Sequence, residues 1–333
     1  LVYIKTDKFL FRMFGRLKTE AALVYFIGKK KYRYQDIFIS TVFLNTTIIL
    51  FLYVLTYLNF ENIYLFFFKN ANSDFRLEFF IILLSVFFQI LYINFNALFP
   101  AINKINVFNK LQVLNSFFTL ILTLGFLFLT SYGLLGICLA TLISPLICFI
   151  YSIKFFPKNF LLKGKLKLNV IRDVLIYSFN YYLVSILQEL QQSGSRLIAA
   201  SIILPEAIAF IDQGQKFSLL LQKTASPIQI TLLPKISSSN KKNSIALVTR
   251  IIRVYSILIL FSSLILFILI KPLILLFYGV DFVPIVKVVY VLIPSLFFKN
   301  ISMILGCYYS GIGIPIKNVY MQIIPLILQI TLT

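Results

Sequence analysis

Residues 174–234 of the chain read VLIYSFNYYLVSILQELQQSGSRLIAASIILPEAIAFIDQGQKFSLLLQKTASPIQITLLP. This stretch is apolar enough to lie in a membrane, yet it carries polar side chains that a membrane span normally avoids. On its first arm these side chains recur at steps of three and four residues, a spacing that places them on one face of a helix. They are Ser178, Tyr181, Ser185, Gln188 and Gln192.

Charged residues follow the same stretch. Glu189 sits beside the polar face, and Arg196 lies in the predicted bend between the two arms. On the second arm Asp212 and Lys216 are four residues apart, and Lys223 follows Lys216 by one heptad. A charge at the bilayer centre costs about 2.5–3.5 kcal/mol on insertion scales, so such residues persist where they face protein or a wet cavity. The stretch therefore predicts a hairpin that forms the wall of a polar, net basic lumen inside a helical bundle.

The composition predicts an all-α, multi-pass integral membrane protein. Hydrophobic residues make up 60% of the 333 residues, against about 45–50% in soluble domains. They concentrate in runs of about 20 residues, enough to cross a hydrocarbon core of roughly 30 Å. The net charge of +20 lies between these runs and not on one soluble face, so nucleic acid is not an expected partner. Histidine is absent, and the isolated Cys138, Cys148 and Cys307 indicate neither a disulfide framework nor a metal site.

The apolar runs place eight complete spans along the chain, with a ninth beginning near Asn318. The spans are expected at about residues 37–58, 79–99, 111–131, 134–156, 174–193, 207–233, 251–270 and 284–306. Residues 21–27 are expected to be the inner end of a further helix. Because the chain starts at Leu1 and its last apolar run is short of a full span, we expect a fragment that lacks terminal helices.

The Lys and Arg residues alternate along the chain. If the amino end is cytoplasmic, the inside segments hold 23 of them and the outside segments hold five. The inside segments are residues 1–36, 100–110, 154–172, 235–253 and 307–317. An excess of this size that repeats loop by loop is typical of the positive-inside rule, and it supports the span count independently.

Five short motifs, in a fixed order, carry a resemblance to a known family. They are Gly15 with AALVY at 21–25, GLLG at 133–136, LLPKIS at 232–237, FYGVDF at 277–282 and YSGIG at 309–313. With these motifs the chain resembles an oligosaccharide flippase of the polysaccharide-transporter branch of the multidrug/oligosaccharidyl-lipid/polysaccharide exporter (MOP) superfamily. The resemblance covers about residues 15–319.

This resemblance implies two pseudo-symmetric six-helix lobes around a central lumen, a MATE-like fold. The first lobe would be residues 1–160 and the second residues 161–333, joined by a basic linker at 157–169. The implied activity is the flipping of polyprenyl-pyrophosphate-linked oligosaccharide from the cytoplasmic to the outer leaflet of a bacterial plasma membrane by alternating access. Its product would feed surface polysaccharides such as O-antigen of lipopolysaccharide. Implied partners are membrane lipids and other polysaccharide-assembly proteins.

A cationic lumen with hydroxyl, amide and aromatic groups suits a pyrophosphate and its sugars. The expected substrate residues are Arg196, Lys216, Lys223, Lys299, Ser178, Asn180, Tyr181, Gln188 and Gln192, with Asn94 and Asn96 from the other lobe. Simpler interpretations remain open: an intrahelical pair for Asp212 and Lys216, a loop charge for Arg196, snorkelling for Lys299, and interhelical hydrogen bonds for the asparagines. The many Phe residues are expected to face lipid, and Pro227 is expected to kink the second arm below Lys223.

No resident cofactor is expected, although transport would use a proton or sodium gradient. Glu189 and Asp212 are the carboxylates well inside spans and are the candidates for this coupling. Two rivals keep the same fold: a multidrug antiporter and a lipid-linked peptidoglycan precursor flippase. A membrane enzyme, such as a polysaccharide polymerase or glycosyltransferase, is disfavoured because the sequence has no His, no acidic cluster and only short outside loops.

Overall fold

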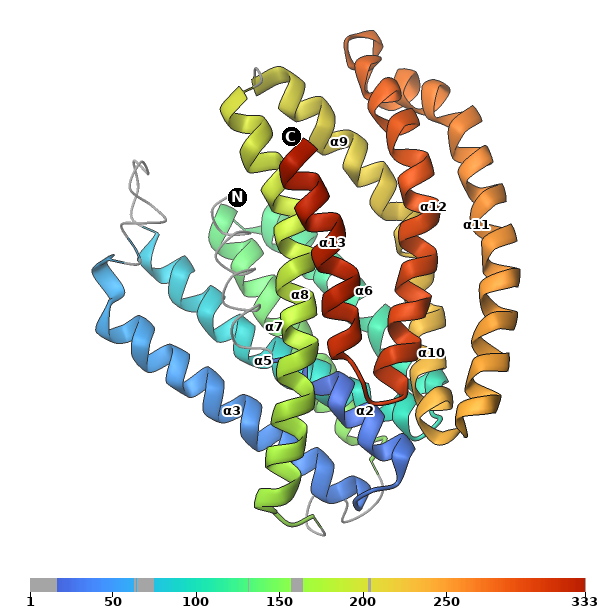
Figure 1. Cartoon of the computed structure of the whole chain (residues 1–333). Coiled ribbons are helices and arrows are strands. Elements are labelled where there is room, and N and C mark those ends of the chain that lie inside the picture. Colours follow the sequence, from blue (N-terminus) through green and yellow to red (C-terminus); the bar gives the residue numbers. More distant parts are fainter. Residues whose placement is uncertain are drawn as a thin grey trace. The chain divides into compact units, whose positions relative to one another are not determined.

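The computed structural model describes residues 17–62, 64, 75–130, 132–156, 164–202 and 205–332. Side chains are described for these residues except 189, 192–202, 205–209, 218 and 328–332. Within these ranges every regular element is a helix (Figure 1). The helices are α2 (Thr19–Lys29), α3 (Tyr34–Leu58), α5 (Arg76–Ala101), α6 (Ile105–Leu129), α7 (Gly133–Ile153), α8 (Leu168–Ile202), α9 (Pro205–Gln222), α10 (Ala225–Ser238), α11 (Lys241–Phe277), the 3-10 turn η2 (Val280–Phe282), α12 (Pro284–Gly311) and α13 (Ile316–Leu332).

Seven segments in the described part of the chain are long and apolar enough to cross a membrane. They are α3, α5, α6, α7, residues 168–188 of α8, α11, and α12 together with η2. A helix rises about 1.5 Å per residue, so the 25 residues of α3 suffice for a hydrocarbon core of roughly 30 Å. The predicted all-α, multi-pass class is therefore confirmed.

The first four predicted spans match α3, α5, α6 and α7 closely, and the short helix expected at 21–27 is α2. The prediction for the hairpin was wrong in two places. First, α8 continues to Ile202, so Arg196 lies within a helix and not in a bend. Polar residues after 190 lower the hydropathy of this part, but they do not stop a helix that has no Pro or capping signal.

The second error concerns the span predicted at 207–233, which is two helices. α9 ends at Gln222, Lys223 and Thr224 form the break, and α10 begins at Ala225. Pro227 consequently lies in the first turn of α10 and does not kink the middle of a longer helix. Proline is tolerated there because the first N–H groups of a helix have no intrahelical acceptor.

The chain divides into two compact units, residues 1–179 and 180–333. In the first unit α5 packs against α6 and α7, and α2 packs against both α3 and α5. Its core contains an aromatic cluster in which Phe95 contacts Phe38, Phe149 and Phe156 at centroid distances of 4.9, 4.7 and 5.2 Å. Phe38 and Phe95 are buried, so the expectation that phenylalanines face lipid was wrong for this group.

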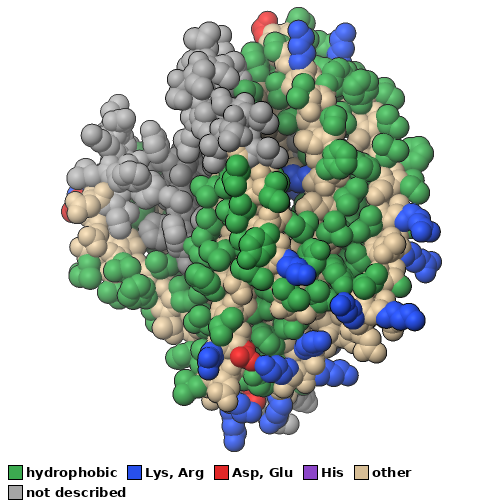
Figure 2. Space-filling model, in the orientation of Figure 1, with side chains coloured by type: hydrophobic (Ala, Val, Ile, Leu, Met, Phe, Trp, Pro, Cys, Tyr) green, Lys and Arg blue, Asp and Glu red, His purple; other side chains and the backbone are tan. Residues whose placement is uncertain are grey.

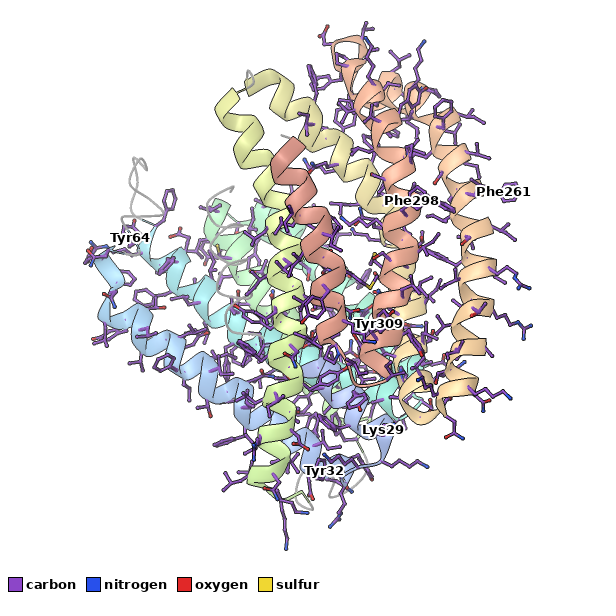
Figure 3. The ribbon with its side chains drawn as sticks, in the orientation of Figure 1. Lys29, Tyr32, Tyr64, Phe261, Phe298 and Tyr309 are labelled. Carbon is purple, nitrogen blue, oxygen red and sulfur yellow. The ribbon has the colours of Figure 1, made fainter. Side chains whose placement is uncertain are left out.

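In the second unit α12 is the central helix, and it packs against α9, α10, α11 and α13. Close approach to α10 depends on Gly311, because a Cβ there would lie 2.5 Å from Ile236. Exposed apolar side chains such as Phe261 project outward from α11 (Figure 3). The predicted division into lobes after residue 160 stays a prediction, and residues 157–163 of the linker lie outside the described ranges.

Candidate functional site

The polar face predicted on α8 is described in part. Ser178 is fully buried, and its Oγ has no hydrogen-bond partner in the described part of the chain. Asn180, Tyr181 and Gln188 are half-buried. Gln192 of this face, Glu189 beside it and Arg196 further along also lie on α8, with side chains outside the described set. The face is thus helical throughout, as its spacing predicts.

The predicted cations of the second arm lie on and after α9. Lys216 is exposed, and its Nζ donates a hydrogen bond to Gln213 Oε1 at 3.2 Å. Asp212 is half-buried one turn earlier on the same helix. Lys223 is exposed in the break between α9 and α10, and Lys299 is half-buried on α12. On α9 the ammonium group of Lys216 and the amide of Gln213 therefore lie side by side.

A polar cluster, in which Tyr255 and Asn300 are buried and Thr224 is exposed, joins the break between α9 and α10 to its neighbours. Tyr255 on α11 donates to Asn300 Oδ1 on α12 at 2.7 Å, and its hydroxyl lies 2.8 Å from Thr224 Oγ1. The Nδ2 of Asn300 donates to the carbonyl of Leu296 within its own helix. This cluster was not predicted from the sequence. Tyr255 and Asn300 are polar residues inside apolar runs, and this position could have indicated hydrogen bonds between helices.

Asn94 and Asn96, expected to contribute to a lumen, are both buried in the first unit. Asn94 Oδ1 accepts a hydrogen bond from Thr19 Oγ1 at 3.2 Å, and its Nδ2 donates to the carbonyl of Ile90. Asn45 Nδ2 in turn donates to Thr19 Oγ1 at 2.6 Å. These bonds join α2, α3 and α5, the interhelical role that the simpler interpretation gave to the asparagines. Asn96 Nδ2 lies 3.4 Å from the Tyr92 hydroxyl.

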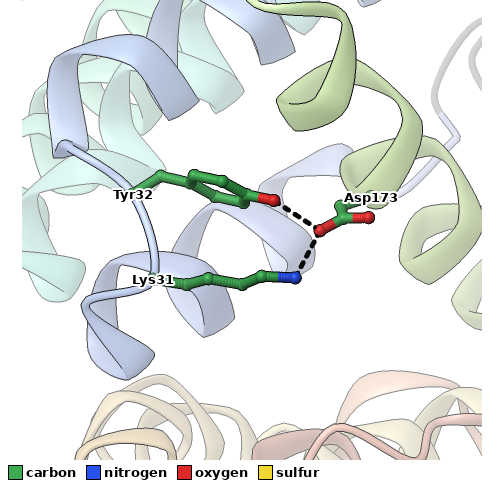
Figure 4. A network of polar contacts seen from close by, with 3 residues as sticks. All are labelled: Lys31, Tyr32 and Asp173. Atoms are coloured by element: carbon green, nitrogen blue, oxygen red, sulfur yellow. Dashed lines mark hydrogen bonds and ion pairs between the residues drawn. The ribbon is translucent and has the colours of Figure 1, made fainter.

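Two carboxylates connect the start of α8 to the loop and helix that follow α2. Asp173 Oδ2 accepts hydrogen bonds from Lys31 Nζ at 2.6 Å and from the Tyr32 hydroxyl at 2.7 Å (Figure 4). The hydrogen bond that Lys31 donates to Asp173 raises the pKa of Lys31, and the same carboxylate raises the pKa of Tyr32. Both donors therefore keep their protons while they hold Asp173.

The second of these carboxylates, Asp36, is almost completely buried in the first turn of α3. Its Oδ2 lies 2.7 Å from Lys167 Nζ, and its Oδ1 accepts a hydrogen bond from the Lys165 backbone N–H at 2.9 Å. The sequence placed these lysines correctly in basic segments but gave no partner for them. The signal was present, because Asp36 and Asp173 are acids within otherwise basic segments.

Among the described residues no group of three or more His, Cys, Asp or Glu side chains could hold a metal ion. The three cysteines are buried and free. Of the predicted coupling pair, Asp212 lies on α9, and the Glu189 side chain is outside the described set. The assignment of both to ion coupling stays a prediction.

No protein-family model matches the chain, and no curated protein sequence matches it. Solved structures do. An outward-facing multidrug resistance MATE family transporter of the MOP superfamily matches with a TM-score of 0.78 and 13% identity, over 98% of this chain and 76% of that chain. The MATE transporter ClbM in complex with Rb+ matches with a TM-score of 0.75 and 17% identity, over 96% and 74%. The bent form of the Vibrio cholerae MATE transporter VcmN matches with a TM-score of 0.76 and 14% identity, over 97% and 77%. The chain therefore has the fold of the MATE transporters of the MOP superfamily.

Proposed function

We propose that this chain is a membrane transporter that flips polyprenyl-pyrophosphate-linked oligosaccharide from the cytoplasmic to the outer leaflet of a bacterial plasma membrane. The MATE-like fold supports a transporter that works by alternating access. The observation that carries the choice of substrate is the pair of exposed lysines on and just after α9: Lys216 lies in the helix and Lys223 follows its last residue. Two exposed ammonium groups in an apolar stretch fit a ligand that brings its own negative charge.

The chemistry of this surface matches the two parts of such a substrate. Ammonium groups form charge-assisted hydrogen bonds with pyrophosphate oxygens, which are stronger than bonds between neutral groups. Amides and hydroxyls, such as Gln213 beside Lys216 and the half-buried Tyr181 and Gln188 of α8, pair with sugar hydroxyls. Surface polysaccharides such as O-antigen are the proposed destination, with other polysaccharide-assembly proteins as partners.

A multidrug antiporter is the second candidate, and a specific observation favours it: one of the matching structures is a multidrug resistance transporter. Its cargo of organic cations would need net acidic surroundings, whereas the expected lumen residues Arg196, Lys216, Lys223 and Lys299 outnumber the two acids inside the spans, Glu189 and Asp212. A flippase for lipid-linked peptidoglycan precursors shares the pyrophosphate chemistry. Proton or sodium coupling through Glu189 and Asp212 belongs to each of these proposals.

The test is deletion of the gene in its host, followed by complementation. The complementing proteins are the wild type, a Lys216→Gln/Lys223→Gln variant and a control variant, Lys241→Gln/Lys242→Gln, which removes two exposed lysines of the same unit. The readouts are lipid-linked oligosaccharide in each leaflet, surface polysaccharide and tolerance to cationic drugs.

We expect precursor to accumulate in the inner leaflet of the deletion strain. Wild type and the control should restore export, and the Lys216→Gln/Lys223→Gln variant should restore it poorly. Equal rescue by both variants would remove these lysines from the transport path. Normal surface glycan with altered drug tolerance would replace the flippase by the multidrug antiporter, and loss of peptidoglycan precursor export would indicate the third candidate.

A further inference from the structure

Three lysines converge on one aromatic pair where α6 begins and α7 ends. Tyr151 and Phe155 make an edge-to-face contact with centroids 5.3 Å apart. Lys110 Nζ lies 5.8 Å from the centre of the Tyr151 ring and 5.9 Å from that of Phe155, and Lys154 Nζ lies 5.5 Å from the centre of Tyr151. Lys104 Nζ donates to the carbonyl of Phe155 at 3.5 Å. We call these five residues the α6–α7 lysine cluster.

The cluster carries positive charge that nothing in the described chain neutralises. All three lysines are exposed, and within the described residues none of them has an ion pair with a carboxylate. The sequence contains no Asp or Glu from Phe79 to Arg172. Like charges gathered in one place repel one another, and an anion among them lowers that repulsion.

The position of the cluster is fixed by the backbone. Asn103 takes a left-handed conformation at φ 61°, which asparagine tolerates, and the following Lys104 N–H bonds to the Phe99 carbonyl at 2.7 Å. Phe99 is fully buried, and its ring contacts Phe155 edge-on at 6.3 Å. The turn and the ring are thus set before any ligand arrives, which reduces the cost of ordering a site.

An exposed apolar strip continues from the cluster along α6. Val113, Phe117 and Leu120 follow Lys110 at steps of three and four, so they share its face of the helix. Their side chains are 68%, 53% and 58% exposed. Lysines at one end of an apolar strip match the shape of a phospholipid, whose charged headgroup is joined to acyl chains. Figure 2 shows hydrophobic side chains covering much of the visible helix surfaces.

We propose that the α6–α7 lysine cluster binds the phosphate headgroup of an anionic phospholipid of the cytoplasmic leaflet. The lysines contact the phosphate. The aromatic pair holds Lys110 and Lys154 through cation–π contacts, and the Phe155 carbonyl holds Lys104. The acyl chains lie along Val113, Phe117 and Leu120. The proposal is independent of the substrate that the transporter carries.

A unique tryptophan reports whether the lipid is there, because the chain contains no Trp. Phe117→Trp places one about 10 Å along α6 from Lys110. The matched control is Phe261→Trp on α11, eight residues from Arg253 and 61% exposed. Each protein is reconstituted in phosphatidylcholine bilayers that contain a small fraction of dibrominated phosphatidylglycerol or, separately, the same fraction of dibrominated phosphatidylcholine.

We expect brominated phosphatidylglycerol to quench Phe117→Trp more strongly than brominated phosphatidylcholine, with little preference at Phe261→Trp. Changing Lys104, Lys110 and Lys154 to Gln should abolish the preference and weaken lipid affinity roughly fivefold for each lysine. Changing all three to Arg should retain it. Changing Lys241, Lys242 and Arg250 to Gln is the control for net charge.

Three results would overturn the proposal. The first is equal quenching by the two lipids at Phe117→Trp, which needs no lysine variant and so does not depend on its folding. The second is an equal loss of the preference for phosphatidylglycerol in the net-charge control, which would show that the lipid responds to the overall positive charge and not to a specific site. The third is displacement of the lipid by millimolar inorganic phosphate, which would make the ligand a free anion.

Discussion

At the scale of single residues, burial distinguishes the ion pairs that stabilise the first unit from the exposed ion pairs that contribute little to its stability. The Asp36 side chain is 1% exposed in its contact with Lys167, whereas Glu61 and Arg76 are 60% and 52% exposed in theirs. A pair in water gives little because both charges are already solvated. A carboxylate taken out of water depends on its partners, so the buried pair is the one whose loss is measurable.

The first prediction compares these two pairs. Asp36→Asn should lower the free energy of unfolding by about 1–3 kcal/mol, because a hydrogen-bonded charge is lost in a buried site. The value stays below that for a fully buried pair, since Lys167 is 51% exposed and can be solvated. Glu61→Gln should cost about 0–1 kcal/mol. Thermal unfolding of both variants in detergent measures the difference, and equal melting temperatures would contradict the prediction.

The second prediction concerns pH and the contact of Lys31 with Asp173. Because the pKa of Lys31 is raised in the folded chain, its contribution to stability is complete below its ordinary pKa of about 10.4. The contribution is lost as pH rises through the raised value. The melting temperature of wild type should therefore exceed that of Lys31→Gln by the same margin at pH 7 and pH 9. The margin should shrink only above about pH 10.4; a margin that disappears between pH 7 and 9 would contradict this assignment.

At the scale of helices, hydrogen bonds between side chains specify which helices meet. Thr19 joins α2 to Asn45 of α3 and Asn94 of α5, and Thr224 joins the α9–α10 break to Tyr255 of α11. Between apolar helices in lipid there is little hydrophobic force to select a partner, so close packing and hydrogen bonds do so. Each helix in these networks is thereby fixed in rotation as well as in position.

The third prediction tests the network around Thr19. Thr19→Val keeps the shape of the side chain but leaves the Asn45 donor and the Asn94 acceptor without Thr19. The free energy of unfolding should fall by about 1–2 kcal/mol, within the range measured for interhelical bonds in membrane proteins and for unpaired buried groups. Thr19→Ser retains the hydroxyl and is the control. If Thr19→Val and Thr19→Ser have the same melting temperature, the hydrogen bonds contribute nothing to stability and packing alone holds α2.

At the scale of the whole molecule, the charges of each unit indicate which helix ends face the cytoplasm. In the first unit the α2–α3 turn and the start of α8 meet through Lys31 and Asp173, and the basic segments next to α6 and α7 meet through Lys104 and Phe155. In the second unit Lys235 lies in the last turn of α10, and Lys241 is the first residue of α11. The positive-inside rule predicts that these segments face the cytoplasm and that η2 lies on the outside.

The fourth prediction tests this orientation with single cysteines. Lys30 and Asp281 are both exposed, and the native Cys138, Cys148 and Cys307 are buried, so background labelling should be low. A membrane-impermeant maleimide added to intact cells should label Asp281→Cys and should label Lys30→Cys only after the membrane is permeabilised. Labelling of Lys30→Cys in intact cells would reverse the topology.

The sequence by itself determined the class, the first four spans and the expected orientation of this protein. These follow from local properties: an apolar run long enough to cross the bilayer is visible as a run, and Lys and Arg between runs are counted directly. The helical spacing of Ser178, Tyr181 and Gln188 was likewise readable, and α8 is helical through all three.

Only the tertiary structure decided where α8 ends, where the next helix breaks and which polar groups meet. At the break between α9 and α10, Thr224 hydrogen-bonds to Tyr255, which is 31 residues away. Asp36 and Lys167 meet across more than 130 residues. Phe38 in the core and Phe261 on the surface are equally apolar in sequence. Hydropathy reports how strongly a segment avoids water. In a membrane an apolar side chain can avoid water by facing lipid or by facing another helix, so only the packing between helices distinguishes core residues from lipid-facing ones.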